Sequence, residues 1–228
     1  MRSTLSQLEW MLDSDRKSKA QLLAQQAVGN SQNVSHILAV AQVFAQRGEN
    51  LDAQSWGEKA LLVSNASNKT AVHGFLGRIY LRRASQEDNA GFYDKARTQL
   101  KMVLETQPRD IVAGNNMAWQ LATKFNLPSE GVNVVEKVRG NASLEQLPPA
   151  FIDTMIDCYQ RNKQIDKAKE IAKEAVGKFP REATLLYRDG VLLSSSEPSQ
   201  AKQMLTRAVQ LGLSADDEAE AKRQLANL

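Results

Sequence analysis

The chain has 228 residues, of which 42% are hydrophobic and 24% are charged, as is usual for a soluble globular protein. Its 29 basic and 26 acidic residues give a formal net charge of +3, which is too small to indicate binding to nucleic acid or to a membrane surface. The single cysteine, Cys158, excludes an intramolecular disulfide and a cysteine-rich zinc cluster. No apolar run is long enough to span a bilayer.

Amphipathic helical segments separated by short polar turns fill the chain from end to end. The periodicity predicts six helical hairpins, in residues 1–33, 34–68, 69–110, 111–147, 148–182 and 183–213, followed by a capping helix in residues 214–228. The fifth hairpin is the most regular, with Tyr159 in its first helix, Ala168, Ala172 and Ala175 in its second, and Pro180 as the stop. The pattern therefore predicts thirteen helices and no sheet.

Equivalent positions recur along these hairpins. A small residue opens each second helix, at spacings of 33, 43, 35, 37 and 33 residues: Ala20, Ala53, Ala96, Gly131, Ala168 and Ala201. Each first helix carries a large apolar residue before it: Met11, Phe44, Tyr80, Leu121, Tyr159 and Leu193. Small residues at helical spacing allow two helices to pack closely, so the recurrence indicates one supersecondary unit repeated along the chain.

The third and fourth hairpins depart from this regularity. Tyr80 and Ala96 are 16 residues apart, whereas Tyr159 and Ala168 are nine apart. The extra residues, within residues 82–92, either extend both helices by a turn or form a protruding loop. In the fourth hairpin a short, β-branched second helix is predicted over residues 129–138, with Gly131 in the small position. We expect this hairpin to be the softest part of the array.

The repeated unit resembles the tetratricopeptide repeat, which is close to 34 residues long with an L-G-x2-Y…A-x3-F…P pattern. Residues 76–80 match its first half literally, and residues 168–180 match its second half with alanine in place of the Phe. Residues 114–122 and 151–160 also resemble a motif pair of bacterial repeat proteins linked to exopolysaccharide and envelope-protein export. This sequence departs from that pair at Ile156 and Asp157.

The resemblance implies an all-α, right-handed α-solenoid of about six repeats plus a capping helix, forming a single domain over residues 1–228. In that family the first helices line a concave groove that holds extended peptides or partner helices. The side chains beside the packing positions are therefore the candidate peptide- or partner-binding set: Arg78, Arg82, Asn115, Asn116, Trp119, Asp153, Asp157, Arg161, Tyr187 and Arg188.

The residue types in this set suit a peptide ligand. Asparagine can bond to a peptide backbone through donors and an acceptor, and arginine offers a fork for carboxylates. Tryptophan and tyrosine supply rigid contact area. We expect an extended segment between the third and fifth hairpins, with Asn116 on its backbone, Arg78 and Arg82 on an acidic group, and Trp119 on an apolar side chain.

A clamp for a terminal carboxylate, a ligand mode that the resemblance also implies, needs five polar or basic positions. Gly74, Arg78, Asn116, Ala150 and Thr154 occupy them, and only Asn116 matches. The sequence therefore favours an internal acidic or polar stretch over a chain terminus.

No catalytic, cofactor-binding or metal-binding constellation is recognisable. His36 and His73 lack the spacing of a zinc-binding helix. There is no nucleophile elbow, phosphate-binding loop or dinucleotide fingerprint. His73 and Cys158 are interpreted as buried packing residues.

The predicted function is a non-enzymatic scaffold that binds a peptide or partner protein in the groove. The alternative is a substrate-docking or regulatory segment of a larger bacterial secretion or exopolysaccharide machine, or of a multidomain enzyme. RNA binding by helical repeats fits less well, because such repeats usually sit in strongly basic chains. Glu9 and Asp13 interrupt any signal-peptide core, so we expect a cytoplasmic protein, or a periplasmic or exported one if a signal lies upstream. The pattern fixes neither the partner nor the oligomeric state.

Overall fold

The protein is all-α. The structure, a computed structural model, describes residues 2–14, 16–29 and 31–228. Over these ranges it contains thirteen α-helices, one short 3-10 helix and no strand, which confirms the predicted fold class. No helix in the described part of the chain is both long enough and apolar enough to cross a membrane.

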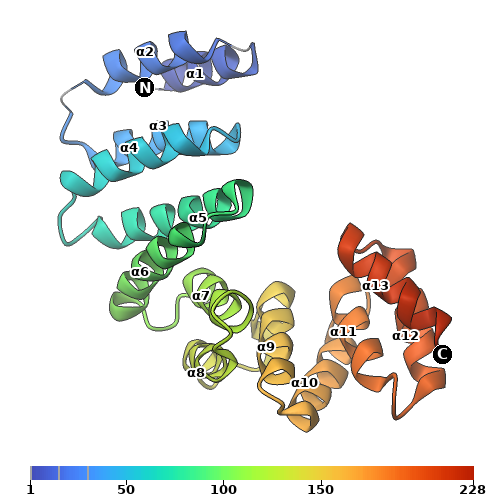
Figure 1. The fold of residues 1–228 in the computed structure, drawn as a ribbon. Helices are drawn as coiled ribbons and strands as arrows, with labels where there is room; N and C mark the ends of the chain where they lie inside the picture. The colour runs from blue at the N-terminus through green and yellow to red at the C-terminus, as the bar shows by residue number, and fades with distance from the viewer. Residues whose placement is uncertain (1, 15, 30) are drawn as a thin grey trace. The chain divides into compact units, whose positions relative to one another are not determined.

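The chain forms two compact units, an N-terminal unit, Met1–Pro108, and a C-terminal unit, Arg109–Leu228. In the N-terminal unit three hairpins follow one another (Figure 1): α1 packs on α2, α3 on α4 and α5 on α6. Neighbouring hairpins are joined by contacts of α1 with α3 and of α4 with α5. The helices are α1 (Arg2–Asp13), α2 (Lys17–Val28), α3 (Val34–Gln46), α4 (Asn50–Leu62), α5 (Lys69–Glu87) and α6 (Ala90–Thr106).

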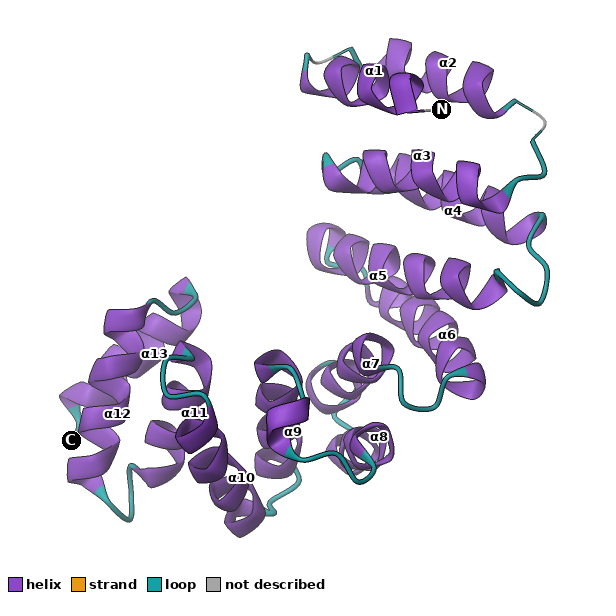
Figure 2. Ribbon diagram, turned by 180° about the vertical axis from the view of Figure 1, so that it is seen from behind, coloured by secondary structure: helices purple, strands orange, loops and turns teal. Residues whose placement is uncertain are grey.

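The C-terminal unit continues the same construction (Figure 2). Its helices are α7 (Ile111–Thr123), α8 (Pro128–Arg139), α9 (Pro149–Arg161), α10 (Ile165–Lys178), α11 (Ala183–Leu193), α12 (Pro198–Leu211) and α13 (Ala215–Ala226), with a 3-10 turn at Leu144–Gln146. The first helices contact one another in order, α7 with α9, α9 with α11 and α11 with α13. This helix order is consistent with six hairpins and a capping helix.

The predicted small positions form the close contacts between paired helices. All six are buried, with 0% exposure at each alanine: Ala20, Ala53, Ala96, Gly131, Ala168 and Ala201. Gly190 on α11 shows how closely two helices approach, because a Cβ added there would lie 2.7 Å from Cγ of Leu205 on α12. The large apolar positions are buried at Phe44, Tyr80, Leu121 and Tyr159 and partly exposed in the first and last hairpins. Periodic packing positions therefore define the core of each unit.

The extra residues of the third hairpin lengthen its helices. α5 has 19 residues and α6 has 17, whereas the other helices have 11 to 14. Asp88, in a left-handed conformation with φ 47°, ends α5, and the side chain of Asn89 caps α6 by accepting a hydrogen bond from Gly91 N. Of the two expectations for the insertion, helix extension is confirmed and the protruding loop is wrong.

The second helix of the fourth hairpin is short, as expected, but two residues longer than the predicted range 129–138. α8 has 12 residues and is, with α2, the shortest second helix among the described residues. Gly131 is buried, and a Cβ there would lie 3.1 Å from Ala118 O and 3.1 Å from Cys158 Sγ. The glycine thus lets α8 pack against both α7 and α9, although its cost in helix propensity remains. That this hairpin opens more readily than its neighbours stays a prediction.

Candidate functional site

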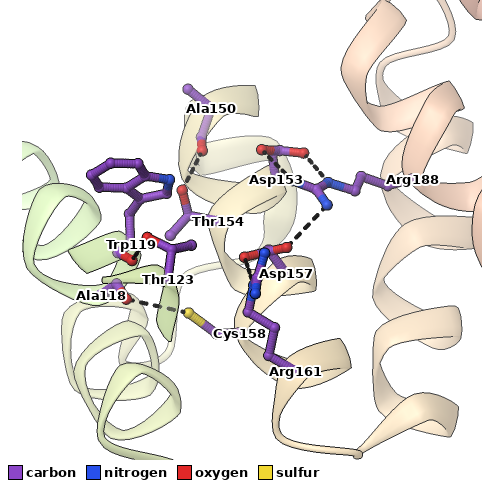
Figure 3. Close-up of polar contacts among 10 residues, drawn as sticks. All are labelled: Ala118, Trp119, Thr123, Ala150, Asp153, Thr154, Asp157, Cys158, Arg161 and Arg188. Carbon is purple, nitrogen blue, oxygen red and sulfur yellow. Dashed lines mark hydrogen bonds and ion pairs between the residues drawn. The ribbon is translucent and has the colours of Figure 1, made fainter. Parts of the chain in front are cut away.

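Five of the ten predicted site residues meet between α9 and α11. Arg188 on α11 donates from Nε to Asp153 Oδ1 at 2.7 Å, from Nη2 to Asp153 Oδ2 at 3.4 Å and from Nη1 to Asp157 Oδ1 at 3.0 Å. Arg161 donates from Nε to the other oxygen of Asp157, Oδ2, at 2.7 Å. Figure 3 shows these side chains meeting between the two helices. We call Asp153, Asp157, Arg161 and Arg188 the α9–α11 network; the fifth residue, Tyr187, precedes Arg188.

The spacing of the sequence explains the geometry of the network. Asp153, Asp157 and Arg161 are four residues apart in succession, so they lie along one face of α9. Pro149 opens α9, where a missing amide hydrogen costs no helical hydrogen bond. The face of α9 behind the network is apolar and buried, with Ile152 and Ile156 at 0% exposure, and this packing fixes the rotation of the helix.

The network is partly withdrawn from water. Asp157 is 7% exposed, and the side chain of Arg188 is 23% exposed. Burial alone would lower the pKa of Arg188, but the neighbouring charges of Asp153 and Asp157 and the Asp153 hydrogen bond outweigh it and raise the pKa. The guanidinium therefore remains charged and holds α9 and α11 together. The side chain of Arg161 is 48% exposed and faces solvent.

A pocket of about 360 Å³ opens beside the network. Such a volume is at the small end of the roughly 300–1,000 Å³ of ligand pockets. The pocket is lined by residues from α9, α11 and α13: Asp157, Gln160, Arg161, Tyr187, Arg188, Val191 and Glu220. Burial, followed by the charge of Asp217, raises the pKa of the Tyr187 hydroxyl, so the hydroxyl is a hydrogen-bond donor at neutral pH.

Three of these lining residues were not predicted from the sequence. Gln160 and Val191 are three and four residues after the predicted Asp157 and Tyr187, so helical spacing could have found them. Glu220 lies on α13, which the sequence indicated only as a solvating cap, and no signal pointed to it.

Three further predicted residues lie on α7, the first helix of the preceding hairpin. The Trp119 side chain is 38% exposed, whereas Asn115 and Asn116 are half-buried. The Asn115 Oδ1 atom is buried and accepts no hydrogen bond from the described residues. α7 contacts α9, and Figure 3 shows Trp119 on the side of α7 near Ala150 and Thr154. We call α7, α9 and α11 the first-helix row.

The two remaining predicted residues belong to the N-terminal unit. Arg78 and Arg82 are exposed on α5. Arg82 Nη1 donates to the backbone oxygen of Ala45 near the end of α3 at 3.0 Å, so this side chain joins two neighbouring hairpins. The grouping of these arginines with the first-helix row stays a prediction.

The described residues contain no group of three or more His, Cys, Asp or Glu side chains that could hold a metal ion. His73 is 7% exposed, and its Nδ1 is hydrogen-bonded with Gln99 Oε1 at 2.7 Å, so the buried packing role is confirmed. Cys158 is also buried, and its Sγ is 3.8 Å from Ala118 O, as a weak thiol hydrogen bond to α7 (Figure 3). Burial, followed by the charge of Asp157, raises the pKa of this thiol to about 12.

No protein-family model and no curated protein matches the sequence. Solved structures match it by fold. YrrB, described as a TPR protein with an unusual peptide-binding site, aligns with a TM-score of 0.62 and 16% identity over 88% of this chain and 97% of its own. The C-terminal part of a TPR repeat-containing protein from Cytophaga hutchinsonii gives a TM-score of 0.67 and 14% identity over 96% and 83% of the two chains. PilW, described as a type IV pilus biogenesis factor, gives 0.67 and 16% over 85% and 86%.

Proposed function

We propose that this chain, which has the tetratricopeptide repeat fold, is a non-enzymatic scaffold that binds an extended segment of a partner protein along the first-helix row. The observation that carries the proposal is the α9–α11 network with the pocket beside it, together with the exposed Trp119 on the neighbouring helix α7. The network holds two first helices at a fixed separation. A preorganised surface of this kind loses little conformational entropy when a ligand binds.

The row presents the three kinds of contact that an extended segment needs. Asn116 offers amide donors and an acceptor to a peptide backbone. Trp119 offers rigid apolar area, and aromatic residues of this kind often dominate binding energy. Arg161 offers solvent-facing guanidinium nitrogens at the pocket. These residues come from α7 and α9, which contact each other, and we expect one segment to reach all three.

The comparisons support the proposal at the level of fold. YrrB is described as having a peptide-binding site, and PilW as a biogenesis factor. Both descriptions suit a role in which one protein engages another. At 16% identity the ligand of neither protein carries over to this chain.

Site-specific photocrosslinking followed by affinity measurement tests the proposal. A benzoylphenylalanine at position 119 is expected to capture a partner that the same group at Lys202, exposed on α12, does not capture. Trp119→Ala and Asn116→Ala are then each expected to lower the affinity for the purified partner at least about tenfold. Truncating a central anchor commonly costs about 2 kcal/mol or more of binding free energy. The far-ultraviolet helical signal should be unchanged.

A matched control and a contrary outcome complete this test. Lys202→Ala should leave the affinity unchanged. If binding survives both row variants and is instead lost on changing α8, α10 or α12, the binding face has been assigned to the wrong helices.

A second candidate function is a docking segment of a larger bacterial envelope machine. The fold likeness to the pilus biogenesis factor PilW favours it. In that case the partner captured at position 119 should be an envelope-assembly component. A partner that resides only in the cytoplasm would contradict this reading while leaving the scaffold proposal intact.

A further inference from the structure

We infer that the pocket between α9, α11 and α13 binds an acidic side chain of the partner's segment through the guanidinium of Arg161. This inference rests on the proposed function and assigns a ligand chemistry to one point of the row. It concerns a side-chain carboxylate within the segment and not a chain terminus.

The carboxylates around the pocket are already engaged. Both oxygens of Asp153 and both oxygens of Asp157 accept hydrogen bonds from Arg188 or Arg161. On α13, Glu220 Oε1 accepts from Gln224 Nε2 at 2.9 Å, and Glu220 Oε2 forms an ion pair with Arg223. A lysine or arginine of a ligand would therefore have to compete with existing cations for every one of these oxygens.

The donors around the pocket are not engaged to the same degree. A guanidinium carries five N–H groups, and Arg161 uses the one on Nε for Asp157. The groups on Nη1 and Nη2 make no hydrogen bond to the described residues, and nearly half of the side-chain surface is exposed. Tyr187 and Gln160, whose side chains carry a hydroxyl and an amide, also line the pocket. The pocket therefore has hydrogen-bond donors without acceptors among the described residues, and an anionic acceptor on the ligand suits them.

Arg161 and Arg188 have different roles within this balance. Arg188 bonds to two carboxylates with Nε and both terminal nitrogens, and its side chain is 23% exposed. It is a positioning residue that holds α9 against α11. Arg161 is oriented by a single bond to Asp157, which leaves the flat edge formed by its two terminal nitrogens open to a carboxylate.

The surroundings favour one carboxylate on a side chain. On α9, Ala150 is apolar and Thr154 Oγ1 donates to Ala150 O at 3.2 Å, so neither position adds a free donor beside Trp119. A terminal carboxylate bound along the row would lack the several convergent donors that it needs. Val191 provides an apolar wall against which the methylene groups of a glutamate or aspartate pack.

Three blocked heptapeptides with the sequence Ala-Leu-Gly-Xaa-Leu-Gly-Ala, acetylated and amidated, test the inference. Xaa is Glu, Gln or Lys, and the full chain is labelled with nitrogen-15 so that arginine Nε–Hε signals report binding. The Glu peptide is expected to shift the Arg161 signal and to bind about tenfold more tightly than the Gln peptide, as a hydrogen bond to a charged group predicts. The Lys peptide is expected to bind more weakly still.

Variants of Arg161 test whether this residue causes the preference for the negatively charged peptide. Arg161→Gln should abolish the preference for the Glu peptide, and Arg161→Lys should retain only part of it, because lysine keeps the charge and loses the fork. The matched control is Arg207→Gln, a change at an exposed arginine of α12, which should leave the preference intact.

The failures of the two proposals are distinguishable. Equal binding of the Glu and Gln peptides, with backbone shifts along α7 and α9, would overturn the acidic-side-chain assignment and leave the scaffold proposal standing. A preference for the Lys peptide would do the same. If no peptide shifts any signal of the first-helix row, both proposals are wrong.

Discussion

Arg188 on α11 bonds to Asp153 on α9 through two nitrogens, at 2.7 and 3.4 Å, and so ties two successive first helices together. Arg188→Ala should lower the free energy of unfolding by about 1–3 kcal/mol, because the charge-assisted bonds are lost and two carboxylates are left facing each other. Urea denaturation measures this. Arg161→Ala, which breaks one bond at a more exposed site, is the control, with a change within about 0.5 kcal/mol expected. Equal losses in the two variants would mean that Arg188 does not join the helices.

Two helical glycines are predicted to respond in opposite directions to alanine. At Gly190 a Cβ would lie 2.7 Å from Leu205 Cγ and 3.2 Å from Leu205 N, so Gly190→Ala should destabilise the protein by about 1–3 kcal/mol. At Gly177 in α10 no atom lies within 4 Å of the added Cβ. Gly177→Ala should therefore stabilise by about 0.5–1 kcal/mol, since alanine loses less entropy in a helix. Urea midpoints that move the same way for both variants would contradict the close approach of α11 and α12.

The fourth hairpin is predicted to open before the fifth. In α8, Val132, Val134, Val135 and Val138 are β-branched and follow Gly131, whereas α10 carries alanines at its packing positions. Native-state hydrogen exchange should therefore show faster exchange over residues 132–138 than over residues 167–176. Equal protection of the two segments would show that the packing of Gly131 against α7 and α9 offsets its poor helix propensity.

Cys158 is predicted to be unreactive in the folded protein. Burial raises the thiol pKa from its ordinary value of 9.0 to about 12, so very little reactive thiolate is present near neutral pH. Because the pKa is raised, the stability that the buried thiol contributes is complete below pH 9.0 and is lost as the pH rises toward about 12. At about pH 8, iodoacetamide should label the native protein far more slowly than the protein in denaturing urea. Comparable labelling rates would mean that α9 exposes this side chain.

The repeat fold could be predicted because its signal runs along the sequence. Ala53 and Ala168 recur at helical spacing from large apolar residues, and burial of such a stripe leaves few alternatives to stacked hairpins. The role of Gly131 could not be read in the same way. Its spacing marks a packing position, but the neighbours that demand a glycine, Ala118 and Cys158, come from two other helices.

Most residues of the candidate site could be predicted from the sequence, but which of them pair with each other could not. Asp153, Asp157 and Arg161 were found because they share one face of α9, and Arg188 because it flanks a packing position on α11. Which acid pairs with which arginine depends on the separation and rotation of two helices, and a sequence pattern carries neither. Glu220 could not be predicted, because α13 is polar along most of its length and no position on it is distinguished by the sequence pattern.

The lengthened third hairpin shows where a repeat chain tolerates growth. Tyr80 and Ala96 keep their buried packing positions although the chain between them is longer than in the fifth hairpin, and residues 85–91 at its tip are all exposed. Gln86 in this tip accepts a hydrogen bond from Asn50 of α4 at 2.8 Å, so a change of length placed after Glu87 is expected to keep the register with the second hairpin. The tip at Asp88 and Asn89 is therefore the natural place to graft an epitope, a fluorophore-binding tag or a protease site, and also where homologous chains are expected to differ most in length.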